Sequence, residues 1–122
     1  MKPRIGVIPG DPSGIGPELV ARLLNEEDVT DVADILLIGD AHVFQSGQQV
    51  AGLSHVLKPV DASTGDWRVE QGFALHAMNT ITPERIQPST ATQAGGASVL
   101  ATLDQALEFA QSGIIDAVVF AP

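Results

Sequence analysis

The sequence predicts a layered α/β/α fold, in which helices cover both faces of a largely parallel sheet. Strand-like apolar runs alternate with helical patterns at both ends of the chain, as in parallel sheets with crossover helices. Residues 35–38 also form a continuous apolar run between turn residues, which is typical of a strand covered on both faces. Of the 122 residues, 44% are hydrophobic and 17% charged, so the composition is that of a globular protein.

The first strand–turn–helix unit has the clearest pattern. Residues 4–8, RIGVI, predict a short buried strand, which leads into a glycine-rich turn over residues 10–16. Pro17 at the first helical position and the acidic Glu18 both favour the start of a helix. The expected apolar face of this helix consists of Leu19, Val20, Leu23 and Leu24.

The middle of the chain gives weaker signals. A strand is expected over residues 33–39. A helix is expected after it, with Asp40 as a plausible N-cap, although Gly47 lowers the helix propensity of this segment. The inward-facing residues of this helix are predicted to be Ala41, Phe44 and Val50. The region beyond it is interpreted as a short strand, a surface loop and a second short strand, at residues 56–60, 61–66 and 73–78.

A long helix and a final strand complete the pattern. The helix is predicted from about residue 97 to residue 111, after Gly95 and Gly96 and with Gly113 as its C-terminal cap. Its expected apolar face is Val99, Leu100, Leu103, Ala106, Leu107 and Ala110. Residues 114–120 then form a strand that stops where a ligand-binding loop would begin, so we expect a fragment of a longer polypeptide. The alternative is a small domain that ends on an edge strand.

Composition excludes several classes of function. The formal net charge of −9 argues against binding to nucleic acid or to an anionic membrane surface. The absence of cysteine excludes disulfides and thiolate chemistry from these residues. No apolar run has the length of a membrane span or of a signal-peptide core. We therefore expect a cytoplasmic protein with neither nucleic-acid nor membrane partners.

The glycine loop, residues 10–16, is the one constellation that suggests a binding site. A turn at the start of a helix presents backbone N–H groups to anions, and glycine allows a ligand to approach closely. The glycine spacing matches neither the dinucleotide fingerprint nor a P-loop, so a purely structural turn is the alternative. Asp11 would repel phosphate but could bind a hydroxyl, a nicotinamide amide or a water molecule; alternatively, it bonds its own backbone.

Residues 8–18, IPGDPSGIGPE, closely resemble the opening signature of 4-hydroxythreonine-4-phosphate dehydrogenases. These enzymes share the fold of isocitrate and isopropylmalate dehydrogenases. Looser similarity extends through residues 35–40, 95–113 and 116–122. The resemblance implies that residues 1–122 are the amino-terminal part of a discontinuous α/β domain whose remainder lies outside this chain. Such an incomplete domain is expected to expose apolar surface and to be marginally stable or associated.

The resemblance also implies a function. Members of the family oxidise and decarboxylate 4-phosphooxy-L-threonine as homodimers, with NAD or NADP and a divalent metal (zinc, magnesium or cobalt), on the route to pyridoxal phosphate. The metal would chelate the hydroxyl and carboxylate of this phosphorylated hydroxy acid. The family's metal-binding histidines and most of its other contacts lie beyond residue 122, so this chain is expected to hold no catalytic or metal-binding residue and to be inactive alone. The residues expected to line the cleft, beside the cofactor or the substrate, are Gly10, Asp11, Pro12, Ser13 and Gly14.

Two functional alternatives stay open. Residues 120–122, Phe-Ala-Pro, differ from the Thr-Gly-Pro that is more usual in the vitamin pathway. They are closer to paralogues that act on threonate or erythronate 4-phosphate or on aromatic dihydrodiols. The second alternative is a non-catalytic module that binds phosphate or a nucleotide with the glycine loop. The three histidines, His42, His55 and His76, have no metal-ligand spacing and are expected to be structural.

Overall fold

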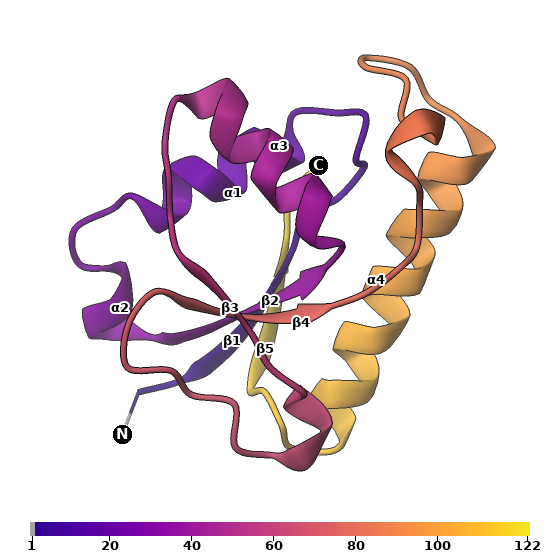
Figure 1. Cartoon of the computed structure of the whole chain (residues 1–122). Coiled ribbons are helices and arrows are strands. Elements are labelled where there is room, and N and C mark those ends of the chain that lie inside the picture. Colours follow the sequence, from indigo (N-terminus) through magenta and orange to yellow (C-terminus); the bar gives the residue numbers. More distant parts are fainter. Residues whose placement is uncertain (1) are drawn as a thin grey trace.

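The computed structural model describes residues 2–122, which form a five-stranded sheet between two helical layers (Figure 1). The predicted α/β class is confirmed. The strands are β1 (Arg4–Ile8), β2 (Asp34–Gly39), β3 (Leu57–Pro59), β4 (Phe73–Ala77) and β5 (Ala117–Phe120). The helices are α1 (Gly16–Leu24), α2 (Val29–Val32), α3 (Ala41–Ala51) and α4 (Gln93–Gln111), with short 3-10 turns η1 (Ala62–Thr64) and η2 (Pro83–Arg85).

The sheet has the strand order β3-β4-β2-β1-β5, and every pairing in it is parallel. Ile5 of β1 lies opposite Ile35 of β2 and Ala117 of β5, so β1 is an interior strand and β5 an edge. Because all strands run in one direction, their carboxyl ends meet at the same edge of the sheet. Open α/β sheets carry their ligand sites at this edge.

The two faces of the sheet have separate cores. Figure 1 shows α1 and α3 on one side of the sheet and α4 on the other. Leu36, Leu37 and Ile38 of β2 are completely buried, and their side chains divide between the two cores. Burial of a side chain of this size contributes about 1.5–3 kcal/mol, so β2 anchors both layers. The burial of this run on both faces, predicted from its continuous apolar character, is confirmed.

Helix α1 occupies its predicted place but presents a different face to the core. The prediction that Leu19 and Leu23 face inward is wrong, because they are 42% and 38% exposed. The side chains that face inward are Val20, Ala21 and Leu24. The cause is that α1 packs both on the sheet and beside α3, so its contact surface is rotated from the apolar stripe.

Helix α3 also differs in its inward face. Val50 was predicted to be buried and is 66% exposed, whereas Gly47 and Gln48 are buried. A Cβ atom added to Gly47 would overlap the carbonyl oxygen of Pro17, at the start of α1. Gly47 therefore allows α3 to approach α1 closely, and its cost in helix propensity is offset by this contact.

Helix α4 begins at Gln93 rather than near residue 97, because Thr92 caps it. The Thr92 hydroxyl accepts the N–H of Gly95 at 2.9 Å, so Gly95 lies within the helix. The predicted apolar face is only partly right: Leu103, Ala106 and Ala110 pack on the core, but Leu100 and Leu107 are 68% and 48% exposed. The buried residues are mostly small or hydroxylated and allow the helix to lie close to the sheet: Gly95, Ser98, Thr102, Ala106 and Phe109.

Apolar side chains remain exposed at the β5 edge and on the outer side of α4. Val119 and Phe120 of β5 are 46% and 65% exposed, in addition to the two leucines of α4. The expectation that the chain exposes apolar surface is confirmed, and its marginal stability or association stays a prediction. None of the helices within residues 2–122 has the length and apolar character needed to cross a membrane.

Candidate functional site

The glycine loop follows β1 at the carboxyl edge of the sheet. It contains a tight turn, in which the Gly14 N–H donates to the Asp11 carbonyl at 3.0 Å. The Ser13 N–H donates to the Asp11 carboxylate at 2.9 Å. Aspartate, proline and glycine are favoured at the first, second and fourth positions of such a turn. The Asp11 side chain therefore accepts a hydrogen bond from the backbone of its own turn, as one interpretation of the sequence expected. Only one of its two carboxylate oxygens is used in this way.

Two glycines of the loop are required by the packing of the chain itself. Gly10 has φ 74°, and a Cβ atom there would overlap the backbone of residues 121 and 122. A Cβ atom on Gly16 would overlap the Pro9 carbonyl oxygen. Gly14 differs, because the nearest atom to such a Cβ would be 3.5 Å away, an ordinary contact distance. Gly14 is exposed, and the packing of the described residues does not require it to be glycine.

Ser13 has a hydroxyl group that the fold does not use. The residue is only 6% exposed, and its hydroxyl has no hydrogen-bond partner within the described residues. Its carbonyl accepts the N–H of Ser89 at 2.7 Å, which ties the glycine loop to the segment before α4. An unpaired buried hydroxyl costs about 1–3 kcal/mol, so its presence calls for a specific explanation.

The loop borders a surface hollow of about 370 Å³. The walls include Asp11, Ser13 and Gly14 of the loop, and Ser89 and Thr90 from the segment before α4. Ser89 has φ 59°, a left-handed conformation that is uncommon for residues other than glycine and is often found at functional sites. Of the five predicted residues, Asp11, Ser13 and Gly14 belong to the wall of this hollow, whereas Gly10 and Pro12 do not.

The start of α4 lies against Asp11. A Cβ atom on Gly95 would be 3.0 Å from the Asp11 carboxylate oxygen, so glycine permits this close approach. The amino-terminal end of a helix carries partial positive charge, which stabilises a nearby carboxylate. The amino-terminal end of α4 therefore adjoins the Asp11 carboxylate in the wall of the hollow.

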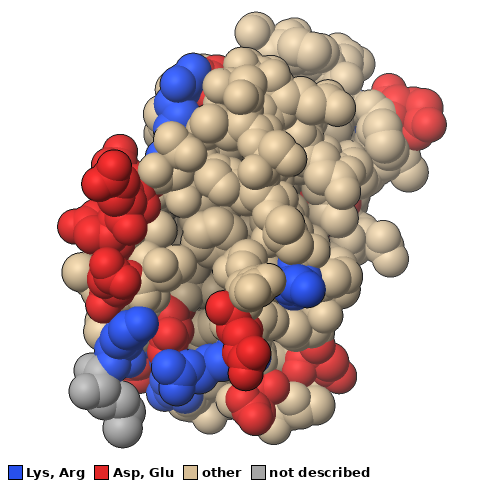
Figure 2. Space-filling model, turned by 60° about the vertical axis from the view of Figure 1, so that its left-hand side comes forward, with Lys and Arg blue, Asp and Glu red and all other residues tan. Residues whose placement is uncertain are grey.

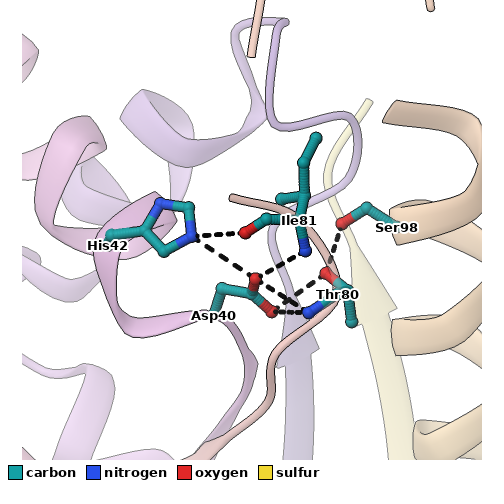
Figure 3. A network of polar contacts seen from close by, with 5 residues as sticks. All are labelled: Asp40, His42, Thr80, Ile81 and Ser98. Carbon is teal, nitrogen blue, oxygen red and sulfur yellow. Dashed lines mark hydrogen bonds and ion pairs between the residues drawn. The ribbon is translucent and has the colours of Figure 1, made fainter. Parts of the chain in front are cut away.

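A buried polar network stands beside the loop at the carboxyl end of β2 (Figure 3). Asp40 is 2% exposed, and its carboxylate accepts hydrogen bonds from the Thr80 N–H and hydroxyl at 2.9–3.0 Å and from the Ile81 N–H at 3.0 Å. The hydroxyls of Thr80 and Ser98 are 2.6 Å apart, so the network reaches α4. His42 Nε2 lies 2.8 Å from the Ile81 carbonyl and 3.4 Å from the Asp40 carboxylate.

This network corrects the role predicted for Asp40. Asp40 does occupy the N-cap position of α3, but its side chain makes no capping hydrogen bond. It binds the segment after β4 instead, because that segment brings two backbone N–H groups within reach. A buried carboxylate needs several donors, and only the tertiary fold supplies them. Sequence spacing could not reveal partners that lie 40 and 41 positions away.

The other two histidines have structural contacts. His55 Nε2 lies 3.1 Å from the Ala21 carbonyl, and the ring packs edge-on against Phe73. His76 Nδ1 accepts the Ala62 N–H at 3.2 Å, and burial lowers the pKa of the imidazole, with Asp61 opposing that effect. Within residues 2–122, no three histidine or acidic side chains converge as a metal site would require.

Charge is unevenly distributed over the surface. Figure 2 shows acidic side chains gathered along one side of a largely uncharged face. The turn after α1 and the helix α2 carry the exposed acids Glu26, Glu27, Asp28 and Asp31. A second hollow, of about 360 Å³, lies near the amino end of β2, where Arg68 pairs with Asp34 at 3.3 Å. It is at the opposite edge of the sheet from the glycine loop.

Comparisons with known proteins give a consistent result. No protein-family model matches the chain. A Pseudomonas aeruginosa protein, provisionally named a second 4-hydroxythreonine-4-phosphate dehydrogenase, is 38% identical over 121 residues, which are 98% of this chain and 36% of that protein. A Symbiobacterium thermophilum protein, provisionally named a D-threonate 4-phosphate dehydrogenase, is 30% identical over 122 residues, which are 99% of this chain and 36% of that protein.

Among solved structures, the fold is similar to that of a 4-hydroxythreonine-4-phosphate dehydrogenase from Burkholderia phymatum. The TM-score is 0.88 and the sequence identity 31%, over 100% of this chain and 37% of the other. The chain thus spans about a third of the length of the proteins that it matches.

Proposed function

Since this chain is homologous over its whole length to an amino-terminal portion of 4-hydroxythreonine-4-phosphate dehydrogenases, we propose that its glycine loop lines the reaction cleft of such an enzyme. The complete protein is proposed to be a cytoplasmic homodimer that oxidises and decarboxylates 4-phosphooxy-L-threonine with NAD or NADP and a divalent metal. Residues 1–122 would form the first part of a discontinuous α/β domain. The observation that carries the proposal is the position of Asp11, Ser13 and Gly14 beside a hollow at the carboxyl edge.

The residues of this chain would bind and orient a ligand. Asp11 and Ser13 are polar residues of the wall of the hollow, and Gly14 beside them has no side chain. The Asp40 network links the end of β2 to the segment after β4 and, through Thr80 and Ser98, to helix α4, whose preceding segment is part of the wall. When bound, a nicotinamide supplies hydride acceptance, and the protein contributes orientation. The described residues do not offer a ligand set for a divalent metal, so its ligands would have to come from outside residues 2–122.

A chimeric enzyme tests this proposal. The chain replaces the corresponding third of the Pseudomonas aeruginosa relative, to which it is 38% identical, and reduction of NAD or NADP is followed with 4-phosphooxy-L-threonine and added divalent metal. We expect turnover by the chimera and none by the 122-residue chain alone. A folded chimera without turnover on any phosphorylated hydroxy acid or dihydrodiol would contradict the proposal. Turnover by the isolated chain would also contradict it.

A second candidate is the same reaction on threonate or erythronate 4-phosphate, or oxidation of an aromatic dihydrodiol. It is favoured by Phe120 and Ala121 and by the relative named for D-threonate 4-phosphate. The ratio of kcat/KM values for the competing substrates is measured with the chimera and with the unmodified Pseudomonas aeruginosa relative, and a shift of the ratio toward threonate or erythronate 4-phosphate or a dihydrodiol in the chimera supports this candidate. A non-catalytic nucleotide- or phosphate-binding module would instead show tight binding by the isolated chain, which calorimetry measures.

A further inference from the structure

The turn at the start of the glycine loop has one side chain without a structural role. Asp11 and Gly14 stand where this type of turn favours aspartate and glycine, and Pro12 presets the backbone at the second position. The third position, Ser13, has no such requirement. Its hydroxyl is nevertheless held in a buried place beside the hollow, without a partner in the described part of the chain.

The polar atoms of this wall have a defined chemistry. The Ser13 hydroxyl can donate one hydrogen bond and accept others. One oxygen of the Asp11 carboxylate accepts the Ser13 N–H, and the other has no hydrogen-bond partner within residues 2–122. A carboxylate accepts hydrogen bonds and does not donate them, so it favours a ligand group that carries a proton to donate. It repels a phosphate placed at the same distance.

We propose that Ser13 and Asp11 form a subsite for a neutral polar group of the ligand, either a hydroxyl or a carboxamide, and that the ligand's phosphate binds elsewhere. Such a group donates to the free carboxylate oxygen and exchanges a hydrogen bond with the serine hydroxyl. This inference rests on the proposed function, because it specifies which part of the ligand the cleft-lining loop recognises. Both a nicotinamide cofactor and a hydroxy-acid substrate offer groups of this kind, so the two sources must be separated by experiment.

The surroundings of the subsite favour this chemistry. Gly14 lies next to Ser13 and is itself exposed, and a Cβ atom there would make only ordinary contacts, so the fold does not require glycine at this position. Gly95 allows the first turn of α4 to lie against the Asp11 carboxylate. Ser89, in its left-handed conformation, donates its N–H to the Ser13 carbonyl and so links the segment before α4 to the loop in the wall of the hollow.

The test compares Ser13→Ala and Asp11→Asn with the exposed control Ser46→Ala in the chimeric enzyme. Loss of one neutral hydrogen bond changes affinity by roughly three- to tenfold, so Ser13→Ala is expected to raise one KM by that factor. A rise confined to the dinucleotide identifies the cofactor as the source of the group, and a rise confined to the hydroxy acid identifies the substrate. Inhibition by inorganic phosphate should be the same in the unmodified chimera and in its three variants.

Two results with an active chimera would overturn the subsite and leave the proposed function intact. The first is an unchanged KM for both ligands in a folded Ser13→Ala variant. The second is inhibition by inorganic phosphate that weakens in Ser13→Ala or strengthens in Asp11→Asn, because that result would place the phosphate at these residues.

If the chimera shows no turnover, the proposed function fails first, and the subsite is tested separately. The 122-residue chain is titrated with nicotinamide riboside, which has a carboxamide and hydroxyls but no phosphate, while the amide resonances of Ser13 and Gly14 are followed. Shifts with nicotinamide riboside and none with inorganic phosphate would support the subsite. Shifts with phosphate alone, or with neither probe, would overturn it.

Discussion

Substitution of Asp40 by asparagine should release the segment after β4 from the carboxyl edge of the sheet. Asparagine keeps one acceptor oxygen, which can serve the Thr80 N–H and hydroxyl. Its NH₂ group then faces the Ile81 N–H, a buried donor that loses its acceptor. An unsatisfied buried donor costs about 1–3 kcal/mol, and the lost carboxylate charge weakens the remaining bonds, so we expect a loss of about 2–3 kcal/mol.

Amide hydrogen exchange measures this loss where it occurs. Since about 1.4 kcal/mol corresponds to a tenfold change in an equilibrium, the opening that exposes the Ile81 amide should become roughly 30- to 150-fold more favourable. The matched control is Asp104→Asn, the same change at an exposed position of α4, for which no acceleration at Ile81 is expected. An unchanged exchange rate at Ile81 in Asp40→Asn would refute the assignment of Asp40 as the residue that holds this segment.

Three further predictions concern packing, pH and association. Gly47→Ala should destabilise the chain by about 1–3 kcal/mol in chemical denaturation, because the added methyl group meets the carbonyl oxygen of Pro17. Gly96→Ala in α4 meets nothing within 4 Å and should stabilise it by about 0.5–1 kcal/mol; equal effects would contradict the packing described. Burial lowers the pKa of His76, so the unfolded chain binds the proton more readily, and stability should fall as pH drops through the unfolded value of 6.5 toward the lower folded pKa. His76→Asn should flatten the dependence of Tm on pH in that window, and an unaltered slope would exclude His76 as its source. Leu107→Glu should reduce self-association of the 122-residue chain in sedimentation experiments, because Leu107 is 48% exposed; no change would locate the contact elsewhere.

Local signals were sufficient for most of the secondary structure. The continuous apolar run in β2 and the proline and acidic residue at the start of α1 reflect local requirements, and both elements lie where they were predicted. The glycine loop was located for the same reason, since turn chemistry depends on adjacent residues.

The faces of the helices depended on tertiary packing and were predicted poorly. Helix α4 buries Ser98 and Thr102 and exposes Leu100, because close approach to the sheet favours small residues whose hydroxyls find partners nearby. An apolar stripe on a helix therefore does not by itself identify the side that packs on the sheet. The Asp40 network was missed for a related reason, because its donors come from a segment distant in the sequence. The unpaired hydroxyl of Ser13 is likewise visible only when its surroundings are known.

The position of bound ligand relative to the glycine loop tests the account most directly. A crystal structure of the active chimera with its dinucleotide and substrate would measure the distances from Ser13 Oγ and Asp11 Oδ2 to the nearest ligand atoms. We predict that at least one hydroxyl or carboxamide group lies within hydrogen-bonding distance, about 2.6–3.2 Å, of these atoms. A structure in which protein residues from outside this chain fill the hollow, with the ligands bound away from the loop, would contradict the account.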